Sequence, residues 1–332
     1  MTIDIVGCGA AVQLLHLAVL RRLQEEQGLI VRGCFDLNPD NARSVGRMLG
    51  AARHGHASQL DDLDEVDAAL VATTPDSHAH YVGLYVTAGK HVLVEKPFVP
   101  TAREAEVVCN MAQSRGARVL VGHFRRFYPS VTAARQLIRA GGLTGIRRVE
   151  ATEGIRWSWP TRSAYITESP YGGVIYDTGS HLLDTVLYVL GLDLPTSAAH
   201  FRIGSNQKWP AKEPSQDCSA SIEIADTAGR SIEICLRISR TEALAGMVSV
   251  YADNGTLLVP TSISSQADLI IAGQRFGLAV PSLDPIPTNA EGCFLLEHME
   301  LMDAARGREE KGILDCQSFV LLTELLEALA AS

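Results

Sequence analysis

The chain has 332 residues, of which 46% are apolar and 20% are charged, and its formal net charge is −9. This composition supports packed cores rather than disorder, and its length indicates two domains at about 150 residues each. The negative charge and the lack of any long basic block argue against nucleic acid as a partner. Charged residues interrupt each apolar run short of the roughly 20 residues that span a bilayer, so we expect no membrane partner.

Seven scattered cysteines, with no C-x-x-C pair, are typical of reduced thiols in a cytoplasm. The first six residues read as a strand and not as a signal peptide, which also favours a cytoplasmic location. The close histidine pairs are His54/His56 and His78/His80, and neither has a cysteine nearby. We therefore predict no metal site and expect these histidines to lie in loops or on the surface.

Short apolar runs alternate with helical patterns in the first third of the chain. Runs without polar alternation indicate strands that are buried on both faces, and their alternation with helices predicts a doubly wound parallel sheet of the α/β class. The expected strands are residues 3–6, 30–35, 68–72, 91–94 and 118–121. The expected helices are residues 11–26, 39–50, 78–89 and 101–115.

Beyond residue 145 the pattern changes to alternating polar and apolar residues with hairpin signals between segments, which predicts a mostly antiparallel sheet. The expected strands are residues 146–156, 197–205, 217–225, 230–239, 247–252 and 256–259. Helical patterns cover residues 176–190, 292–306 and 315–330, and residues 260–290 read as a long loop.

Directly after the first strand comes the segment 7–12, Gly-Cys-Gly-Ala-Ala-Val. In a dinucleotide site, Gly7 would allow a tight turn and Gly9 would let a pyrophosphate approach the backbone. The amides of Ala10 and Ala11 would meet the phosphates at the start of the next helix. Val12 stands at the third glycine position and predicts a slightly displaced helix. Taken alone, the segment equally fits an ordinary glycine-rich turn.

Asp36 ends the second strand, 29 residues after Gly7. A carboxylate there accepts hydrogen bonds from the adenosine ribose and repels a 2′-phosphate, so it favours NAD over NADP. Two alternatives stay open. Asp36 is also suited to a turn before Pro39, and Arg43 or Arg47 would be available to an NADP phosphate.

Two further strand ends lie at the same edge of the expected sheet, where open α/β sheets bind ligands. Lys96 leaves a buried strand and precedes Pro97, which restricts Lys96 to extended geometry. That setting is unlike a solvated lysine in a surface turn, which is the alternative interpretation. The predicted cofactor contacts at these strand ends are Thr73, Thr74, Pro75, His78, Glu95 and Lys96.

Asp177, His181 and Asp184 are spaced so that a regular helix places them on one face. A carboxylate one turn from an imidazole can orient it for acid and base catalysis near neutral pH. The alternative is that Asp177 is a helix N-cap and His181 a core histidine.

The segment 156–165, Arg-Trp-Ser-Trp-Pro-Thr-Arg-Ser-Ala-Tyr, combines flat indoles with hydrogen-bond donors. This combination suits a polyhydroxylated ring, although one indole of such a pair can simply belong to the core. Arg162 would neutralise a carboxylate or a nucleotide-sugar phosphate. The predicted substrate residues of this segment are Trp157, Trp159, Arg162 and Tyr165.

These motifs lie at residues 7–12, 36–39, 74–78, 89–97, 122–129 and 172–184, and together they span nearly the whole chain. In combination they resemble the Gfo/Idh/MocA family of glucose-fructose oxidoreductases, inositol dehydrogenases and rhizopine catabolism proteins. The resemblance implies a Rossmann NAD-binding domain over residues 1–122 and an α+β domain over residues 123–332 for substrate binding and oligomerisation. It also implies a large open sheet, mostly antiparallel, through which a homodimer or homotetramer forms.

The resemblance further implies that Lys96, Asp177 and His181 are the catalytic residues and also contact the substrate, together with Arg125. In the oxidative direction His181 would remove a hydroxyl proton, Asp177 would steady the imidazolium and the hydride would pass to nicotinamide C4. Lys96 would hydrogen-bond the same oxygen and stabilise a developing alkoxide. The chain departs from the family pattern at Val12 and at Phe124.

The sequence thus predicts an NAD-dependent dehydrogenase or ketoreductase that acts on a CH–OH group of a sugar, a sugar derivative such as a nucleotide sugar, or a cyclitol such as an inositol. One alternative is an epimerase, eliminase or glycosidase that returns the hydride to its substrate from a bound NAD. A second alternative is a non-catalytic sensor of NAD or sugar.

Overall fold

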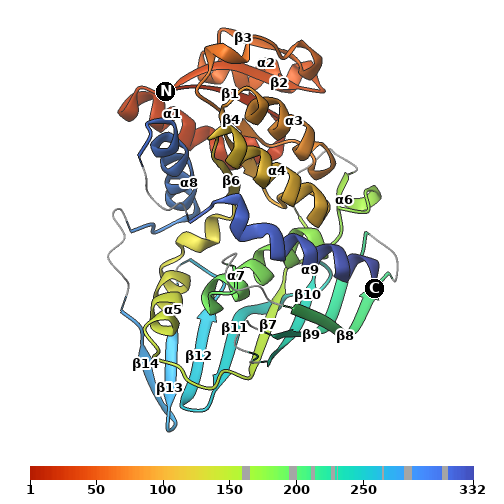
Figure 1. The fold of residues 1–332 in the computed structure, drawn as a ribbon, viewed down its shortest axis with the longest axis vertical. Coiled ribbons are helices and arrows are strands. Elements are labelled where there is room, and N and C mark those ends of the chain that lie inside the picture. The colour runs from red at the N-terminus through yellow and green to blue at the C-terminus, as the bar shows by residue number, and fades with distance from the viewer. Residues whose placement is uncertain are drawn as a thin grey trace. The chain divides into compact units, whose positions relative to one another are not determined.

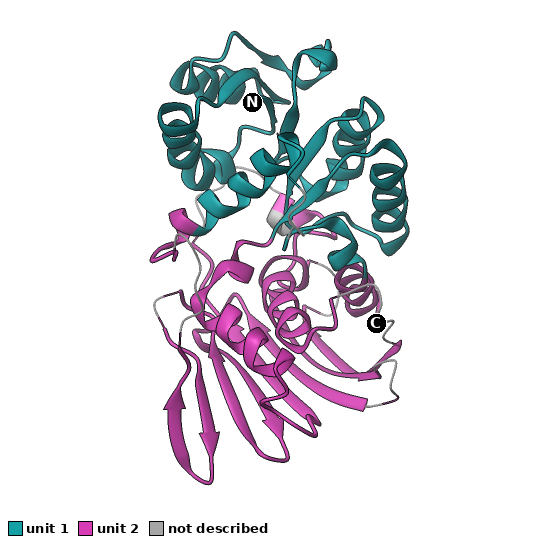
Figure 2. Ribbon diagram, turned by 60° about the vertical axis from the view of Figure 1, so that its left-hand side comes forward, with its two compact units in different colours: residues 1–122, 160–162, 293–320 teal, residues 123–159, 163–292, 321–332 magenta. Residues whose placement is uncertain are grey.

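The computed structural model describes residues 1–158, 165–193, 200–210, 214–225, 229, 231–263, 265–279, 286–308 and 313–332. They form two compact units (Figure 2). Among these residues, the first unit comprises 1–122 together with those between 293 and 320, and the second comprises the rest. The segment 293–320 differs from the sequence-based ranges because its buried side chains, including Cys293, Phe294 and Leu301, pack with the first unit.

The first unit is built on a six-stranded sheet in the order β3-β2-β1-β4-β5-β6, and each pair of neighbours is parallel (Figure 1). The strand order reverses direction between β1 and β4, which is where doubly wound sheets bind ligands. The strands are β1 (Thr2–Val6), β2 (Ile30–Asp36), β3 (Arg53–His56), β4 (Ala68–Val71), β5 (His91–Glu95) and β6 (Val119–Gly122).

Helices connect these strands, as the hydrophobic pattern predicts. A π-helical turn (Val12–His16) leads into α1, and the side chains of Asn38 and Thr101 cap the starts of α2 and α4. Glu104 completes a capping box with Thr101. The helices are α1 (Leu17–Gln27), α2 (Pro39–Leu49), α3 (Pro75–Thr87), α4 (Ala102–Arg115) and α8 (Ala290–Ala305).

The two histidine pairs have different surroundings. His54 and His56 belong to the edge strand β3, which the sequence analysis missed because Arg-His-Gly-His carries no apolar run. His54 and His80 are exposed, as predicted for surface histidines, whereas His56 is half-buried. His78 is fully buried in α3, so the prediction of a loop or surface position is wrong for His78.

The second unit contains an eight-stranded sheet in the order β14-β13-β12-β11-β7-β10-β9-β8. Among the described strands of this sheet only the β7–β10 pair is parallel, so the sheet is mostly antiparallel as predicted. The strands are β7 (Arg148–Gly154), β8 (His200–Trp209), β9 (Asp217–Ala225), β10 (Ser231–Ser239), β11 (Leu244–Ala252), β12 (Gly255–Pro260), β13 (Asp268–Ile271) and β14 (Gln274–Gly277).

The expected loop at residues 260–290 contains the hairpin β13–β14, which extends one edge of this sheet. Short strands with turn residues between them escape a pattern search, because hydrogen bonding to β12 defines them more than their own side chains do. The prediction of a long loop is therefore wrong for residues 268–277, which form this hairpin.

Strands β9 and β10 bury every second side chain, because helices cover one face of the eight-stranded sheet. The helix α7 is buried along nearly all of its length and packs against β7 and α5. The helices of this unit are α5 (Pro129–Arg139), α6 (Tyr165–Glu168), α7 (Ser180–Leu190) and α9 (Val320–Ala331). Within the described part of the chain, none of the helices has the length and apolar character needed to cross a membrane.

Candidate functional site

The glycine turn links β1 to the helical segment that follows it. Gly7 has a φ of +88°, and a Cβ built on it would lie 2.4 Å from the carbonyl oxygen of Ala72. A side chain at Gly7 is thus excluded by both backbone conformation and space. A Cβ on Gly9 would meet no protein atom within 4 Å, so the backbone there borders open space. This difference fits a turn whose first glycine is needed for folding and whose second leaves room for a ligand.

Asp36 ties the end of β2 to this turn. Its Oδ2 accepts a hydrogen bond of 2.6 Å from the backbone N–H of Cys8, and its Oδ1 accepts one of 2.7 Å from that of Asn38. The carboxylate remains partly exposed, with further lone pairs available to a ligand. The residues present therefore fit a dinucleotide, whose phosphates the amides of Ala10 and Ala11 would meet.

We expect Gly7→Ala to impair folding and Gly9→Ala to impair cofactor binding. Gly7→Ala should lower the free energy of unfolding by at least about 2 kcal/mol, because it forces strain and a clash with backbone. Gly9→Ala should change it by less than about 1 kcal/mol but weaken NADH binding about tenfold or more, because its methyl group occupies ligand space. Urea unfolding and fluorescence titration with NADH measure both effects. Unaltered NADH binding by Gly9→Ala would contradict the assignment of this turn.

His78 braces the two loops that follow β4 and β5. Its Nδ1 lies 3.0 Å from the carbonyl oxygens of both Pro97 and Phe98, and its Nε2 lies 3.1 Å from that of Thr73. Burial lowers the pKa of His78, although the three carbonyl groups oppose this. Because the ring is fully buried, His78 supports these loops from inside the unit. A direct contact with the cofactor stays a prediction, as it does for Thr73, Thr74 and Pro75.

Lys96 follows β5 directly and is half-buried. The preceding residue, Glu95, is 8% exposed, and its Oε2 accepts a hydrogen bond of 3.0 Å from the backbone N–H of Lys96. The peptide between Lys96 and Pro97 is cis. The backbone on both sides of Lys96 is thus held by buried neighbours, as expected for a side chain whose position matters.

In the second unit, Asp177 lies in a π-helical turn (Ile175–Gly179) that precedes α7. Its Oδ2 lies 2.7 Å from Nη2 of Arg240, which is 3% exposed. Arg240 also donates to the carbonyl oxygen of Gly172 at 2.7 Å and stacks over the ring of Trp157 at 4.5 Å. Arg240, which sequence reasoning missed, therefore positions both Asp177 and Trp157.

His181 lies in the first turn of α7 and is 8% exposed. The ring of Phe124 contacts it edge to face, with centroids 5.4 Å apart, and the ring of His123 does so at 5.7 Å. Phe124, a departure from the family pattern, therefore forms part of the wall around the predicted base. His123 is fully buried beside it and was not predicted.

Asp184 belongs to a buried ion cluster. Its carboxylate accepts hydrogen bonds of 2.6 Å and 3.0 Å from Arg126, and its Oδ2 lies 3.5 Å from Nδ1 of His123. Arg126 also reaches Asp193 at 3.2 Å, and Asp193 accepts from Arg135 at 2.8 Å. Asp184 therefore serves this cluster. The π-helical turn contains Asp177 and ends before His181, so it changes their spacing from that of a regular helix, whereas His181 and Asp184 both lie in α7.

The remaining predicted substrate residues have different surroundings. Arg125 forms a bidentate ion pair with Glu153, in which Nη1 and Nη2 donate to the two carboxylate oxygens at 2.6 Å and 2.8 Å. The hydroxyl of Tyr165 donates to the carbonyl oxygen of Tyr171 at 3.2 Å. Trp159 and Arg162 lie outside the described residues. Substrate contact stays a prediction for all four.

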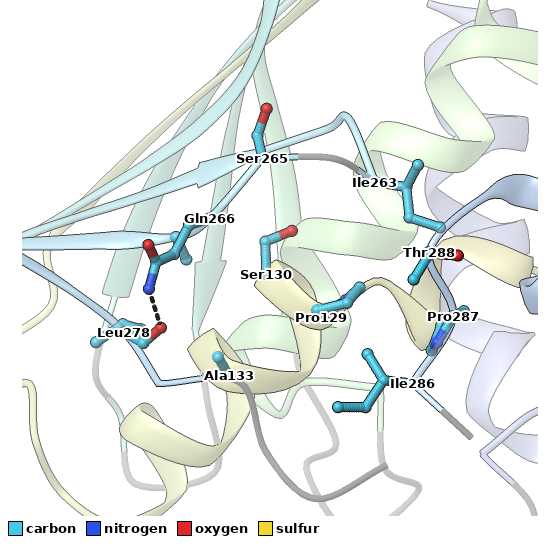
Figure 3. Close-up of a pocket in the computed structure, with 11 residues that line it drawn as sticks. Pro129, Ser130, Ala133, Ile263, Ser265, Gln266, Leu278, Ile286, Pro287 and Thr288 are labelled. Carbon is cyan, nitrogen blue, oxygen red and sulfur yellow. Dashed lines mark hydrogen bonds between the residues drawn. The ribbon is translucent and has the colours of Figure 1, made fainter. Parts of the chain in front are cut away.

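A cavity of about 440 Å³ lies in the second unit, between α5 and the segments around β13 and β14 (Figure 3). Pro129, Ser130 and Ala133 line it from α5, and Ile263, Gln266 and Leu278 line it from the sheet edge. None of the predicted site residues is among its lining residues. Among the described residues, no group of His, Cys, Asp or Glu side chains could hold a metal ion.

The first unit has the strand order and the glycine turn of a Rossmann dinucleotide-binding fold. Two family models match the chain. The model described as "Oxidoreductase family, NAD-binding Rossmann fold" matches residues 1–123, and the model described as "GFO/IDH/MocA C-terminal domain" matches residues 131–258. The chain belongs to the Gfo/Idh/MocA oxidoreductase family, as its motifs predicted.

Among its relatives is a 1-carboxy-3-chloro-3,4-dihydroxycyclohexa-1,5-diene dehydrogenase of Comamonas testosteroni, 29% identical over 56% of this chain and 46% of that protein. Inositol 2-dehydrogenase 2 of Saccharopolyspora erythraea is 31% identical over 60% of this chain and 57% of that protein. The matches thus span about half of these relatives. A 3-ketoreductase of Actinomadura kijaniata, solved with NADP and TDP-benzene, shares the fold with a TM-score of 0.77 and 18% identity, over 100% of this chain and 97% of that chain.

Proposed function

We propose that the protein is an NAD(H)-dependent oxidoreductase that transfers a hydride between nicotinamide and a secondary hydroxyl or ketone. The observation that carries this proposal is the glycine turn, where open space at Gly9 adjoins the partly exposed carboxylate of Asp36. Membership of an NAD-binding oxidoreductase family supports it independently.

We assign the proton transfer to Lys96, Asp177 and His181. A bound nicotinamide supplies the hydride acceptor or donor. In the oxidative direction His181 takes the hydroxyl proton and Asp177, whose carboxylate is fixed by Arg240, stabilises the imidazolium. The Lys96 ammonium donates a hydrogen bond to the substrate oxygen and stabilises the charge that develops there.

We propose a sugar, a sugar derivative or a cyclitol as substrate. Two relatives are a dihydroxycyclohexadiene dehydrogenase and an inositol dehydrogenase by name, and both names denote hydroxylated six-membered rings, which supports this class. The structural neighbour with TDP-benzene supports a nucleotide sugar as one member of it. Trp157, held under Arg240, offers an indole for stacking on such a ring. We also retain the prediction of a homodimer or homotetramer formed through the eight-stranded sheet.

For the cofactor, Asp36 favours NAD, because its carboxylate would repel the 2′-phosphate of NADP. A neighbour of the same fold was solved with NADP, which supports NADP as the alternative cofactor. The dissociation constants of NADH and NADPH, measured by fluorescence titration, decide between them, and a preference for NADPH would overturn the role of Asp36.

The test of the reaction is a screen of the purified protein with free NAD⁺ against inositols, other cyclitols, hexoses, sugar acids and nucleotide sugars. We expect net reduction of NAD⁺, followed by nicotinamide absorbance, with at least one of these classes. A cofactor that stays bound while the substrate is epimerised or cleaved would indicate internal hydride return instead. Binding of NADH without turnover of any class would favour a sensor.

A further inference from the structure

A line of buried polar side chains in the first unit connects the helical segment after the glycine turn with Lys96. His16 ends the π-helical turn before α1 and is 1% exposed. Glu95 ends β5, and His298 lies on α8 and is 2% exposed. None of these three side chains has a role in the proton transfer proposed above.

Each member of the line contacts the next at hydrogen-bond distance. Glu95 uses its Oε2 for the backbone N–H of Lys96, at 3.0 Å. Its Oε1 lies 2.8 Å from Nε2 of His16, and Nδ1 of His16 lies 2.9 Å from Nε2 of His298. The ring of Phe294 packs edge to face on His16 at 5.0 Å and closes its apolar side.

The protonation of the line follows from its surroundings. Burial raises the pKa of Glu95, but the hydrogen bond and charge of His16, followed by the charge and N–H of Lys96, outweigh it, so the pKa is lowered. Glu95 is thus an ionised acceptor, and His16 donates to it from Nε2. Burial, together with His16, holds the pKa of His298 well below its ordinary value, so this ring is neutral.

We propose that Glu95 and His16 are positioning residues that hold the backbone of Lys96 in place relative to the helical segment after the glycine turn, and that His298 holds the imidazole of His16 in place. The inference rests on the proposed role of Lys96. A displacement of about 1 Å at a reacting group can cost about 10²-fold in rate, so we expect loss of this buried contact to lower the rate.

Glu297, the neighbour of His298 in sequence, provides a matched control. Glu297 is fully buried, with an exposure of 0%. Its carboxyl oxygens have no hydrogen-bond partner among the described residues. Burial, then the charges of Glu95 and Glu300, raise its pKa well above the ordinary value. Glu297 is therefore a neutral acid outside the line, and Glu297→Gln keeps its size and its lack of charge.

The experiment compares Glu95→Ala, Glu95→Gln and Glu297→Gln on a substrate found in the screen. We expect Glu95→Ala to lower kcat about tenfold or more, while KM for the substrate stays within about threefold. Glu95→Gln should recover most of kcat, because its amide oxygen still accepts from the backbone N–H of Lys96 and its amide nitrogen stays within hydrogen-bond distance of Nε2 of His16. Glu297→Gln should keep the wild-type kcat. A Glu95→Gln variant as impaired as Glu95→Ala would overturn positioning in favour of charge.

Lys96→Ala, run in parallel, separates this inference from the proposed function. Loss of activity in Lys96→Ala with wild-type kcat in Glu95→Ala would refute the positioning role alone, whereas full activity in Lys96→Ala would refute the proposed role of Lys96. A second readout needs no substrate. Hydrogen exchange at the backbone amide of Lys96 should rise about tenfold or more in Glu95→Ala and stay unchanged in Glu297→Gln. Equal exchange in both variants would also refute the inference.

Discussion

Lys96→Ala and His181→Ala should each lower kcat by about 10²–10⁴-fold, the usual cost of losing a positioned proton-transfer group. Lys96 is half-buried at the end of β5, and His181 is enclosed by the rings of Phe124 and His123. Steady-state kinetics with the substrate identified by the screen measures the effect. Circular dichroism and thermal unfolding check that both variants fold.

Matched controls come from the same residue types elsewhere. Lys90, whose ammonium donates to the carbonyl oxygen of Asp64, and His80, which is exposed, have no part in the proposed site. Lys90→Ala and His80→Ala should keep the wild-type kcat. The assignment of the proton-transfer residues is wrong if folded Lys96→Ala and His181→Ala both turn over at the wild-type rate.

Arg126→Met should lower the free energy of unfolding by about 3–5 kcal/mol, because it leaves the carboxylates of Asp184 and Asp193 buried without their shared cation. Arg126 is 1% exposed and also lies 4.7 Å from the ring of Tyr188. Burial lowers the pKa of Arg126, but Asp184 outweighs it and the pKa is raised, so the cation persists. Urea unfolding followed by circular dichroism measures the loss.

The control for Arg126→Met is Arg148→Met. Arg148 pairs with Glu150 at 3.0 Å and with Glu233 at 3.3 Å, but all three side chains are close to half exposed. An exposed pair contributes about 0–1 kcal/mol, so Arg148→Met should be nearly neutral. Equal losses for the two variants would show that burial does not set the strength of the Arg126 cluster.

Much of the first unit could be predicted because its signals are local. Strands buried on both faces have to be continuously apolar, and a turn with a φ of +88° at Gly7 has to contain glycine. The weaker edge elements β3 and the hairpin β13–β14 escaped prediction, since they depend on hydrogen bonds to a neighbouring strand. Their own residues have little periodic pattern.

The partners of the site residues could not be predicted, because they come from positions far apart in the chain. Asp177 meets Arg240, and Glu95 meets His16 and through it His298. Helical spacing indicated that Asp184 lies one turn from His181, but it did not reveal that Asp184 pairs with the buried Arg126, which lies 58 residues away in the chain.

Sequence alone therefore determined the family, the parallel sheet and the glycine turn, since each is recorded in local pattern and spacing. Only the tertiary structure decided which charges neutralise one another and which rings enclose His181. Those contacts are set by packing between elements, where a buried polar group has to find a partner wherever the fold brings one within reach.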